Sequence, residues 1–283
     1  MDIRQVGRSM GAEVTGVDLR RLDDATFERI HEAFLAHQVL VVRDQAMTPE
    51  VQIAFSRRFG PLEDQLNAHY TVEGYPEVLV LSNDIKDGKP VGLIDGGDSW
   101  HSDSSHRDKP SMATMLYAVK NPDHGGDTEF ANMYAAYETL PGDLKRRIGG
   151  LNGIHAVSKL RNKRVTVSAR RPDAKDFYEK QKSIPDQVWP LVRTHPETGR
   201  KALYVSPRFT IGIEGLPEDE ADGILDQLFA HQIRQEFLYR HKWQDRDLVI
   251  WDNRCVIHHA TGGYAFPDVR TMHRTVIAGD RPY

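Results

Sequence analysis

A histidine and an aspartate two positions apart, His101 and Asp103, form the first pattern in the sequence that could do chemistry. In an extended strand the side chains of residues i and i+2 point to the same face, so this imidazole and this carboxylate could bind one metal ion. A His-x-Asp triplet alone is common, and a metal site would need a third ligand from a distant part of the chain. Two neighbouring histidines, His258 and His259, are the candidates for that ligand.

Two histidines and one carboxylate are the donor set of more than one kind of metal centre. They form the facial triad of non-haem Fe(II) oxygenases, which leaves coordination positions open for a cosubstrate and for oxygen. Zinc accepts the same donors, so the ligand types alone leave both metals open.

The segment 269–277 alternates like a strand and carries Arg270 and Arg274 on the same face. At the rise of a strand these two positions are about 13 Å apart. If their face points into the protein, each guanidinium needs an anion, because an unpaired buried charge is costly. A diacid cosubstrate and an anionic substrate would supply the two anions. The alternative is that both arginines face solvent or pair with acidic side chains of the protein.

The elements that must position these residues are mostly strands. Patterns typical of strands cover 39–42, 77–82, 111–119, 189–194, 201–206, 236–243, 247–252 and 269–277. Helices are predicted over 24–37, 49–59, 133–148 and 217–232. Because the strands do not alternate strictly with helices, they favour a sandwich or barrel with helices packed outside over a parallel doubly wound sheet.

Composition limits the class of protein further. The chain has 283 residues, of which 39% are hydrophobic and 28% charged, as in a soluble globular protein of one domain with embellishments. A net charge of −4 gives no reason to expect a nucleic-acid partner. The one cysteine, Cys255, excludes an intrachain disulfide. No signal peptide and no membrane-spanning apolar run is present, so we expect a cytoplasmic protein.

Two segments are candidate active-site lids. Residues 85–100 contain four glycines just before the His-x-Asp triplet. Residues 157–188 contain nine Lys or Arg against four Asp or Glu, which would attract an anionic substrate. The alternative for the second segment is a solvated insertion.

The sequence resembles a known family along almost its whole length. The resemblance is carried by the motifs at 11–19, 55–63, 100–104, 125–130, 251–258 and 270–274. These motifs are similar to those of the taurine and 2,4-dichlorophenoxyacetate dioxygenases, which are Fe(II)- and 2-oxoglutarate-dependent enzymes. The resemblance implies an α+β fold: one domain over 1–283 with a clavaminate synthase-like double-stranded β-helix, or jelly roll, and flanking helices.

The resemblance also implies roles for single residues. The implied iron ligands are His101, Asp103 and His258. The family's last ligand is the fourth residue after the arginine of Trp-Asp-Asn-Arg, which selects His258 over His259. Thr128 and Arg270 match the groups that hold the distal carboxylate of 2-oxoglutarate, since a guanidinium binds a carboxylate through two parallel hydrogen bonds and a hydroxyl can add a third. Trp251 is expected to line the cofactor pocket.

The reaction that the resemblance implies consumes O2 and hydroxylates a small anionic organic substrate while 2-oxoglutarate is decarboxylated to succinate and CO2. Arg274 matches the arginine that binds the sulfonate in the taurine enzyme, and His69 and Tyr70 lie where the family has a substrate-contacting segment. More segments resemble the 2,4-dichlorophenoxyacetate branch, so we expect an aryloxyalkanoate that is cleaved to a phenol and a 2-oxo acid. An alkyl sulfonate such as taurine, or a sulfate ester, is the alternative. The family also implies a homo-oligomer, a dimer or a tetramer.

Two functions of other classes compete with this interpretation. The first is a metal-binding β-helix protein without oxygenase activity, against which Thr128, Arg270 and Arg274 speak, because a bare metal site needs no groups for a diacid. The second is a zinc hydrolase, which would need a general base beside the ion. No further Asp or Glu accompanies the three ligands in the sequence. The histidines outside these motifs, such as His195 and His241, are expected to be structural.

Overall fold

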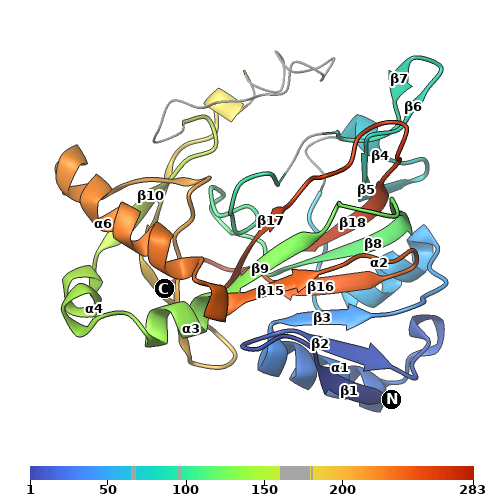
Figure 1. Ribbon diagram of the computed structural model, residues 1–283, viewed down its shortest axis with the longest axis horizontal. Coiled ribbons are helices and arrows are strands. Elements are labelled where there is room, and N and C mark those ends of the chain that lie inside the picture. Colours follow the sequence, from blue (N-terminus) through green and yellow to red (C-terminus); the bar gives the residue numbers. More distant parts are fainter. Residues whose placement is uncertain (65–67, 95–96, 160–178, 180) are drawn as a thin grey trace.

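Two sheets that face each other organise the computed structural model, which describes residues 1–64, 68–94, 97–159, 179 and 181–283 (Figure 1). In spatial order the larger, eight-stranded sheet contains β1 (Asp2–Gln5), β2 (Ala12–Thr15), β3 (Val39–Val42), β16 (Leu248–Asp252), β8 (Ala113–Lys120), β18 (Thr271–Ile277), β5 (Tyr75–Ser82) and β4 (Thr71–Val72). The smaller sheet contains β15 (Leu238–His241), β9 (Thr128–Asn132) and β17 (Val256–Ala260). Of these pairs only β2 and β3 run parallel.

Two helices cover the outer face of the larger sheet. Helix α1 (Asp24–His37) begins where the side chain of Asp23 accepts a hydrogen bond from the backbone of Thr26, and it ends at Gln38 in the left-handed conformation. Helix α2 (Pro49–Arg57) begins after Thr48, whose hydroxyl caps the first turn. Both helices thus begin where the sequence predicts.

Most of the remaining elements gather at one end of the facing sheets (Figure 1). Helix α6 (Glu218–Gln232) lies there, with strands β10 (Asn152–His155), β11 (Gln187–Pro190), β14 (Thr210–Ile213), β12 (Val192–Thr194) and β13 (Lys201–Leu203). The single strand predicted over 189–194 is therefore two strands, because β11 pairs with β10 whereas β12 pairs with β13.

One predicted helix is also two. The sequence pattern predicts a helix over 133–148, and the structure has α3 (Met133–Glu138) and α4 (Gly142–Ile148). Pro141 lies between them. Proline has no N–H donor and disfavours a helical backbone in the residue before it, so the first helix ends.

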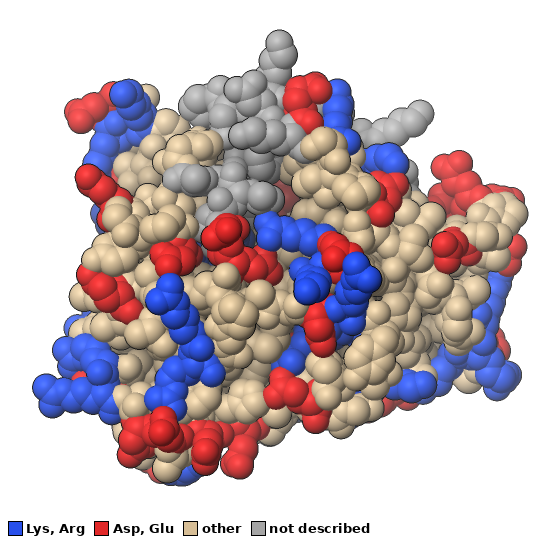
Figure 2. Space-filling model, turned by 180° about the vertical axis from the view of Figure 1, so that it is seen from behind, with Lys and Arg blue, Asp and Glu red and all other residues tan. Residues whose placement is uncertain are grey.

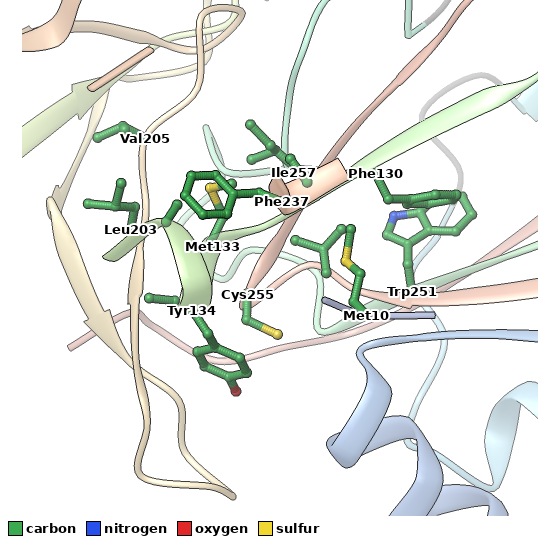
Figure 3. Packing of buried hydrophobic residues seen from close by; sticks show 14 of the residues in the cluster. Met10, Phe130, Met133, Tyr134, Leu203, Val205, Phe237, Trp251, Cys255 and Ile257 are labelled. Atoms are coloured by element: carbon green, nitrogen blue, oxygen red, sulfur yellow. The ribbon is translucent and has the colours of Figure 1, made fainter. Parts of the chain in front are cut away.

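The larger sheet is buried on both faces by alternate residues of its central strands. Residues that point to the smaller sheet include Val39, Val41, Leu116, Ala118 and Val249. Residues that point to α1 and α2 include Leu40, Val42, Met115, Tyr117, Leu248 and Ile250. Figure 3 shows the first of these clusters, in which Phe130 of β9 lies beside Trp251 of β16. The main core therefore begins between the two sheets and continues among α3, α4 and α6.

Strand β18 follows the same alternation. Arg274 pairs with Leu116 and Met272 with Ala118, and cross-strand partners share a face, so both point into the space between the sheets. The next residue, Thr275, points the other way and its hydroxyl lies 2.7 Å from Oγ of Ser56 in α2. The face of β18 that carries Arg274 therefore points inward.

The two facing sheets, with helices packed outside, form the double-stranded β-helix that the resemblance implies. No helix among the described residues is long and apolar enough to cross a membrane. On the face shown in Figure 2, acidic and basic side chains are interspersed among uncharged ones.

The two predicted lids are described only in part. Residues 95–96 of the first, and 160–178 and 180 of the second, lie outside the described residues. The described part of the first contains the short hairpin β6 (Ile85–Lys86) and β7 (Lys89–Pro90). In the second, Lys159 forms an ion pair with Asp186 at 2.6 Å. A lid function for either segment stays a prediction.

Candidate active site

Three predicted metal ligands meet between the sheets. The backbone of His101 pairs with that of His258 in the middle of β17, through N–H···O hydrogen bonds of 3.0 and 2.8 Å. Nε2 of His101 lies 3.5 Å from Oδ1 of Asp103, and Nε2 of His258 lies 3.9 Å from Oδ2. All three residues are buried. One donor atom from each lies within 4.8 Å of the others, which suits a single ion with bonds of about 2.0–2.2 Å.

The hydrogen bonds of the cluster leave ring nitrogens available for a metal. Nδ1 of His101 lies 2.7 Å from the carbonyl oxygen of Ser99, which can only accept, so the lone pair of this ring is on Nε2 and points towards Asp103. Burial and the neighbouring His101 lower the pKa of His258 to about 3, so this imidazole is neutral at pH 7.

Arg274 contributes to the electrostatics of the same cluster. Burial alone would raise the pKa of Asp103. The two imidazoles and the Arg274 guanidinium have a larger, opposite effect, so the net pKa lies below the usual range. Asp103 is thus a carboxylate at neutral pH. A neutral His258 imidazole beside an ionised Asp103 is the protonation state in which these two groups bind a divalent cation.

Two other histidines, His259 and His195, have ring nitrogens that are held by hydrogen bonds to protein groups. Nε2 of His259 lies 3.0 Å from a carboxylate oxygen of Glu129, and as the next residue along β17 it points away from the face of His258. His195 has both nitrogens engaged: Nε2 donates to Asp252 at 2.9 Å, and Nδ1 accepts backbone N–H groups. Asp252 also accepts from Arg254. His195 is therefore structural, as predicted.

A second group of residues surrounds the predicted 2-oxoglutarate clamp. Arg270 is buried, and its Nε has no hydrogen-bond partner among the described residues. Burial lowers its pKa, since Tyr264 and Asp127 compensate the charge only in part. Thr128 is buried at the start of β9, and the glycine before Asp127, Gly126, has φ +70°. A Cβ at Gly126 would lie 3.1 Å from Cδ of Arg270, so the Gly-Gly motif gives the arginine room.

Trp243 connects the two clamp residues, and the sequence did not predict it. Its Nε1–H donates to Oγ1 of Thr128 at 3.0 Å, and its ring lies 5.6 Å from the Arg270 guanidinium carbon. An indole N–H can only donate, so the Thr128 hydroxyl accepts from Trp243 and keeps its own hydrogen for an acceptor such as a carboxylate. Only the tertiary arrangement reveals this contact, because no motif surrounds Trp243.

A second residue that the sequence did not single out is Arg208. Its guanidinium carbon lies 4.7 Å from the ring centre of Phe209, and its Nη1 has no hydrogen-bond partner within the described part of the chain. The Phe209 ring packs against His101 and His106, at centroid distances of 6.0 and 4.8 Å. Arg208 thus places a cation beside an aromatic ring that touches a predicted metal ligand.

The structure places the other predicted site residues as follows. Trp251 packs against His258, with ring centroids 4.6 Å apart, and belongs to the core between the sheets (Figure 3). Tyr70 is buried in a small cluster with Leu79 and Leu93, and the ring of the exposed His69 packs against it. The roles of Trp251 in cofactor binding and of His69 and Tyr70 in substrate binding stay predictions.

Known proteins are similar to this chain in sequence and in fold. Residues 2–276 match the family described as taurine catabolism dioxygenase TauD, TfdA family. The α-ketoglutarate-dependent 2,4-dichlorophenoxyacetate dioxygenase of Cupriavidus pinatubonensis is 39% identical over 260 residues, which cover 87% of each chain. The (S)-phenoxypropionate/α-ketoglutarate-dioxygenase of Sphingobium herbicidovorans is 36% identical over 99% of this chain and 95% of its own. A solved structure of AAD-2 with Mn(II) and N-oxalylglycine matches with a TM-score of 0.82 and 32% identity, over 99% of this chain and 98% of that one.

Fold, buried cluster and relatives define an oxidoreductase of the 2-oxoglutarate-dependent dioxygenase class, 2-oxoglutarate being another name for α-ketoglutarate. The chain belongs to the TauD, TfdA family of that class. Its cofactor is Fe(II), and its cosubstrates are 2-oxoglutarate and O2.

Proposed function

We propose that this enzyme oxidises an aryloxyalkanoate, which then breaks down to a phenol and a 2-oxo acid. The observation that carries the proposal is the position of Arg274, an inward-pointing cation beside the His-Asp-His cluster whose Nε has no partner among the described residues. A substrate carboxylate would supply that partner. Phe209, in ring contact with His101, would pack against an aryl group. The relatives that act on 2,4-dichlorophenoxyacetate and phenoxypropionate support the same class.

In this proposal each residue of the site has a separate task. His101, Asp103 and His258 hold the iron. Arg270 and the hydroxyl of Thr128 bind the distal carboxylate of 2-oxoglutarate. Bound Fe(II) supplies the activation of O2 that couples cosubstrate decarboxylation to substrate oxidation.

The rest of the site positions the reactants. Arg274 binds the substrate anion on the inner face of the larger sheet. Arg208 adds positive charge near Phe209, which favours an anionic over a neutral substrate. Because these groups lie on strands or directly beside them, the oxidised carbon is held at a defined place, and positioning is the main contribution of the protein.

The substrate class is tested with the wild-type enzyme and a matched panel. Under anaerobic conditions, Fe(II) and 2-oxoglutarate are added to the apoprotein, and the visible charge-transfer band of the chelate is followed as aryloxyacetates, aryloxypropionates and alkyl sulfonates are added. Air is then admitted, and succinate, phenol and sulfite are measured. We expect a band that shifts with an aryloxyalkanoate and release of one phenol per succinate.

The same panel tests the alternative. Sulfite release from taurine or another alkyl sulfonate, without phenol release, would overturn the aryloxyalkanoate proposal and leave the dioxygenase class intact. A chelate band that no aryloxyalkanoate perturbs would count against it equally. The proposed dimer or tetramer is measured separately, by light scattering of the purified protein.

A further inference from the structure

A chain of hydrogen bonds lies directly behind the Asp103 carboxylate. The hydroxyl of Thr114 donates to Oδ2 of Asp103 at 2.6 Å. Thr114 belongs to β8, is fully buried and points inward, opposite Trp251 of β16 and Val276 of β18. The larger sheet thus supplies a hydrogen-bond donor to the carboxylate.

The direction of the Thr114 hydroxyl is set by Asn253. The side-chain amide nitrogen of Asn253 donates to Oγ1 of Thr114 at 3.0 Å. A hydroxyl that accepts from an amide on one side directs its own hydrogen elsewhere, and the Asp103 carboxylate is the acceptor within reach. Thr114 is therefore a donor to Asp103.

The orientation of the Asn253 amide is itself determined. Its Oδ1 lies 3.0 Å from Nε1 of Trp251 and 3.3 Å from the backbone nitrogen of Asp103, and both of these groups can only donate. A flipped amide would place its NH2 group against two N–H donors. Separately, the main-chain carbonyl oxygen of Asn253 accepts from the hydroxyl of Ser102, at 2.6 Å. Each hydrogen in the chain from Trp251 to Asp103 therefore has one direction.

We propose that Thr114 is a positioning residue, which holds the Asp103 carboxylate in the rotation in which it binds the metal, and that Asn253 keeps the Thr114 hydroxyl turned towards it. The inference rests on the proposed role of Asp103 as a ligand. With Oδ2 held by Thr114, Oδ1 faces Nε2 of His101 at 3.5 Å. Outer hydrogen bonds of this kind restrict the orientation of a ligand before the metal arrives.

The test measures metal affinity of the apoprotein, without turnover, by anaerobic titration with Co(II) followed by its visible absorption. Thr114→Val removes the hydroxyl and keeps the shape, and we expect it to weaken Co(II) binding about 10- to 100-fold. Thr114→Ser keeps the hydroxyl and should bind within a few-fold of wild type. The matched control is Thr275→Val, which removes an equally buried hydroxyl that lies against α2, and should leave Co(II) affinity unchanged.

Asn253→Ala tests the second step of the argument. If Asn253 acts through Thr114, the double variant Thr114→Val/Asn253→Ala should bind Co(II) no more weakly than the worse single variant. Effects that multiply in the double variant would overturn the relay from Asn253. Should Thr114→Val fail to fold, as judged by circular dichroism, Thr114→Ala takes its place.

Asp103→Ala separates this inference from the proposed function. Wild-type Co(II) affinity in Asp103→Ala would show that Asp103 is no ligand, and the proposed site would fail. Loss of binding in Asp103→Ala together with wild-type affinity in Thr114→Val would leave the site intact and overturn only the role of Thr114.

Discussion

His101 and His258 exchange two main-chain hydrogen bonds, each N–H donating to the carbonyl oxygen of the other residue. Their rings are 4.3 Å apart, centre to centre. The backbone pairing of His101 with β17 of the smaller sheet thus fixes the distance between two predicted ligands.

Metal removal should therefore leave the fold intact. We expect chelator-treated protein to keep its far-ultraviolet circular dichroism and to unfold cooperatively. Added Fe(II) or Mn(II) should raise the melting temperature in a concentration-dependent way, because the ion binds the folded state only. Loss of secondary structure on chelation would contradict this expectation.

Arg274 of β18 and Arg270, which directly precedes this strand, should have separable effects. Arg270→Ala should weaken 2-oxoglutarate binding by about 2–5 kcal/mol, since a buried charged partner of the carboxylate is lost. Arg274→Ala should spare 2-oxoglutarate binding and weaken binding of the primary substrate. Anaerobic titrations of the chelate band measure the first affinity, and the shift of the band by the substrate measures the second. Equal effects of both variants on both ligands would show that the roles are wrong.

Trp243 should support 2-oxoglutarate binding through its N–H group. Trp243→Phe keeps an aromatic ring beside Arg270 but frees the Thr128 hydroxyl to turn. We expect a loss of about 1–2 kcal/mol, roughly a 5- to 30-fold rise in the Kd of 2-oxoglutarate. Trp189→Phe is the control, because that indole donates to the backbone of Ser105 instead. Equal Kd values for the Trp243 variant and wild type would refute the role.

Acid should destabilise the protein through the buried network around Asp252. Burial alone would raise the pKa of Asp252. Arg254 and His195 have a larger, opposite effect, so the net pKa is well below the usual range. Hydrogen bonds from His31 and Arg254 lower the pKa of Glu197 to about 2. Carboxylates with a depressed folded pKa stabilise the protein above their unfolded pKa, near 4, and this stability is lost as the pH falls from about 4.5 towards 2.

Urea unfolding at pH 6, 4 and 3 measures that loss. Asp252→Asn should lower the free energy of unfolding at pH 6 by about 3–5 kcal/mol, since Arg254 and His195 lose a buried charged partner. The same variant should depend less on pH than wild type below pH 4.5. An unchanged pH dependence would place the acid-sensitive groups elsewhere.

The sequence predicts those parts of the site that follow from strand periodicity. The shared face of Arg270 and Arg274 follows from this alternation, and of the two directions that the sequence left open the structure shows the inward one for Arg274. The choice of His258 over His259 came from the family resemblance instead. Side-chain contacts between segments that are distant in the sequence cannot be predicted from this alternation. Trp243 reaches Thr128, and Thr114 reaches Asp103, only because distant segments come together in the fold.

Local breaks in an element also depend on context. Pro141 within 133–148 is visible in the sequence, yet the apolar pattern continues past it and suggested one helix. Arg208 follows a predicted strand without any motif, so its contact with Phe209 could be found only in three dimensions.

One proposed anion-binding arginine, Arg274, lies on β18 and the other, Arg270, directly precedes it, which has a consequence for regiochemistry. Arg270 and Arg274 are separated by four residues of extended backbone, about 13 Å, and no loop lies between them. With the cosubstrate held at one end and the substrate anion at the other, the carbon nearest the iron is set by its number of bonds from the anion. In a homologous series of substrates, a methylene added on the far side of that carbon from the anion would leave oxidation at the same carbon. A methylene inserted between the anion and that carbon would place a different carbon of the chain nearest the iron, and oxidation would move to it.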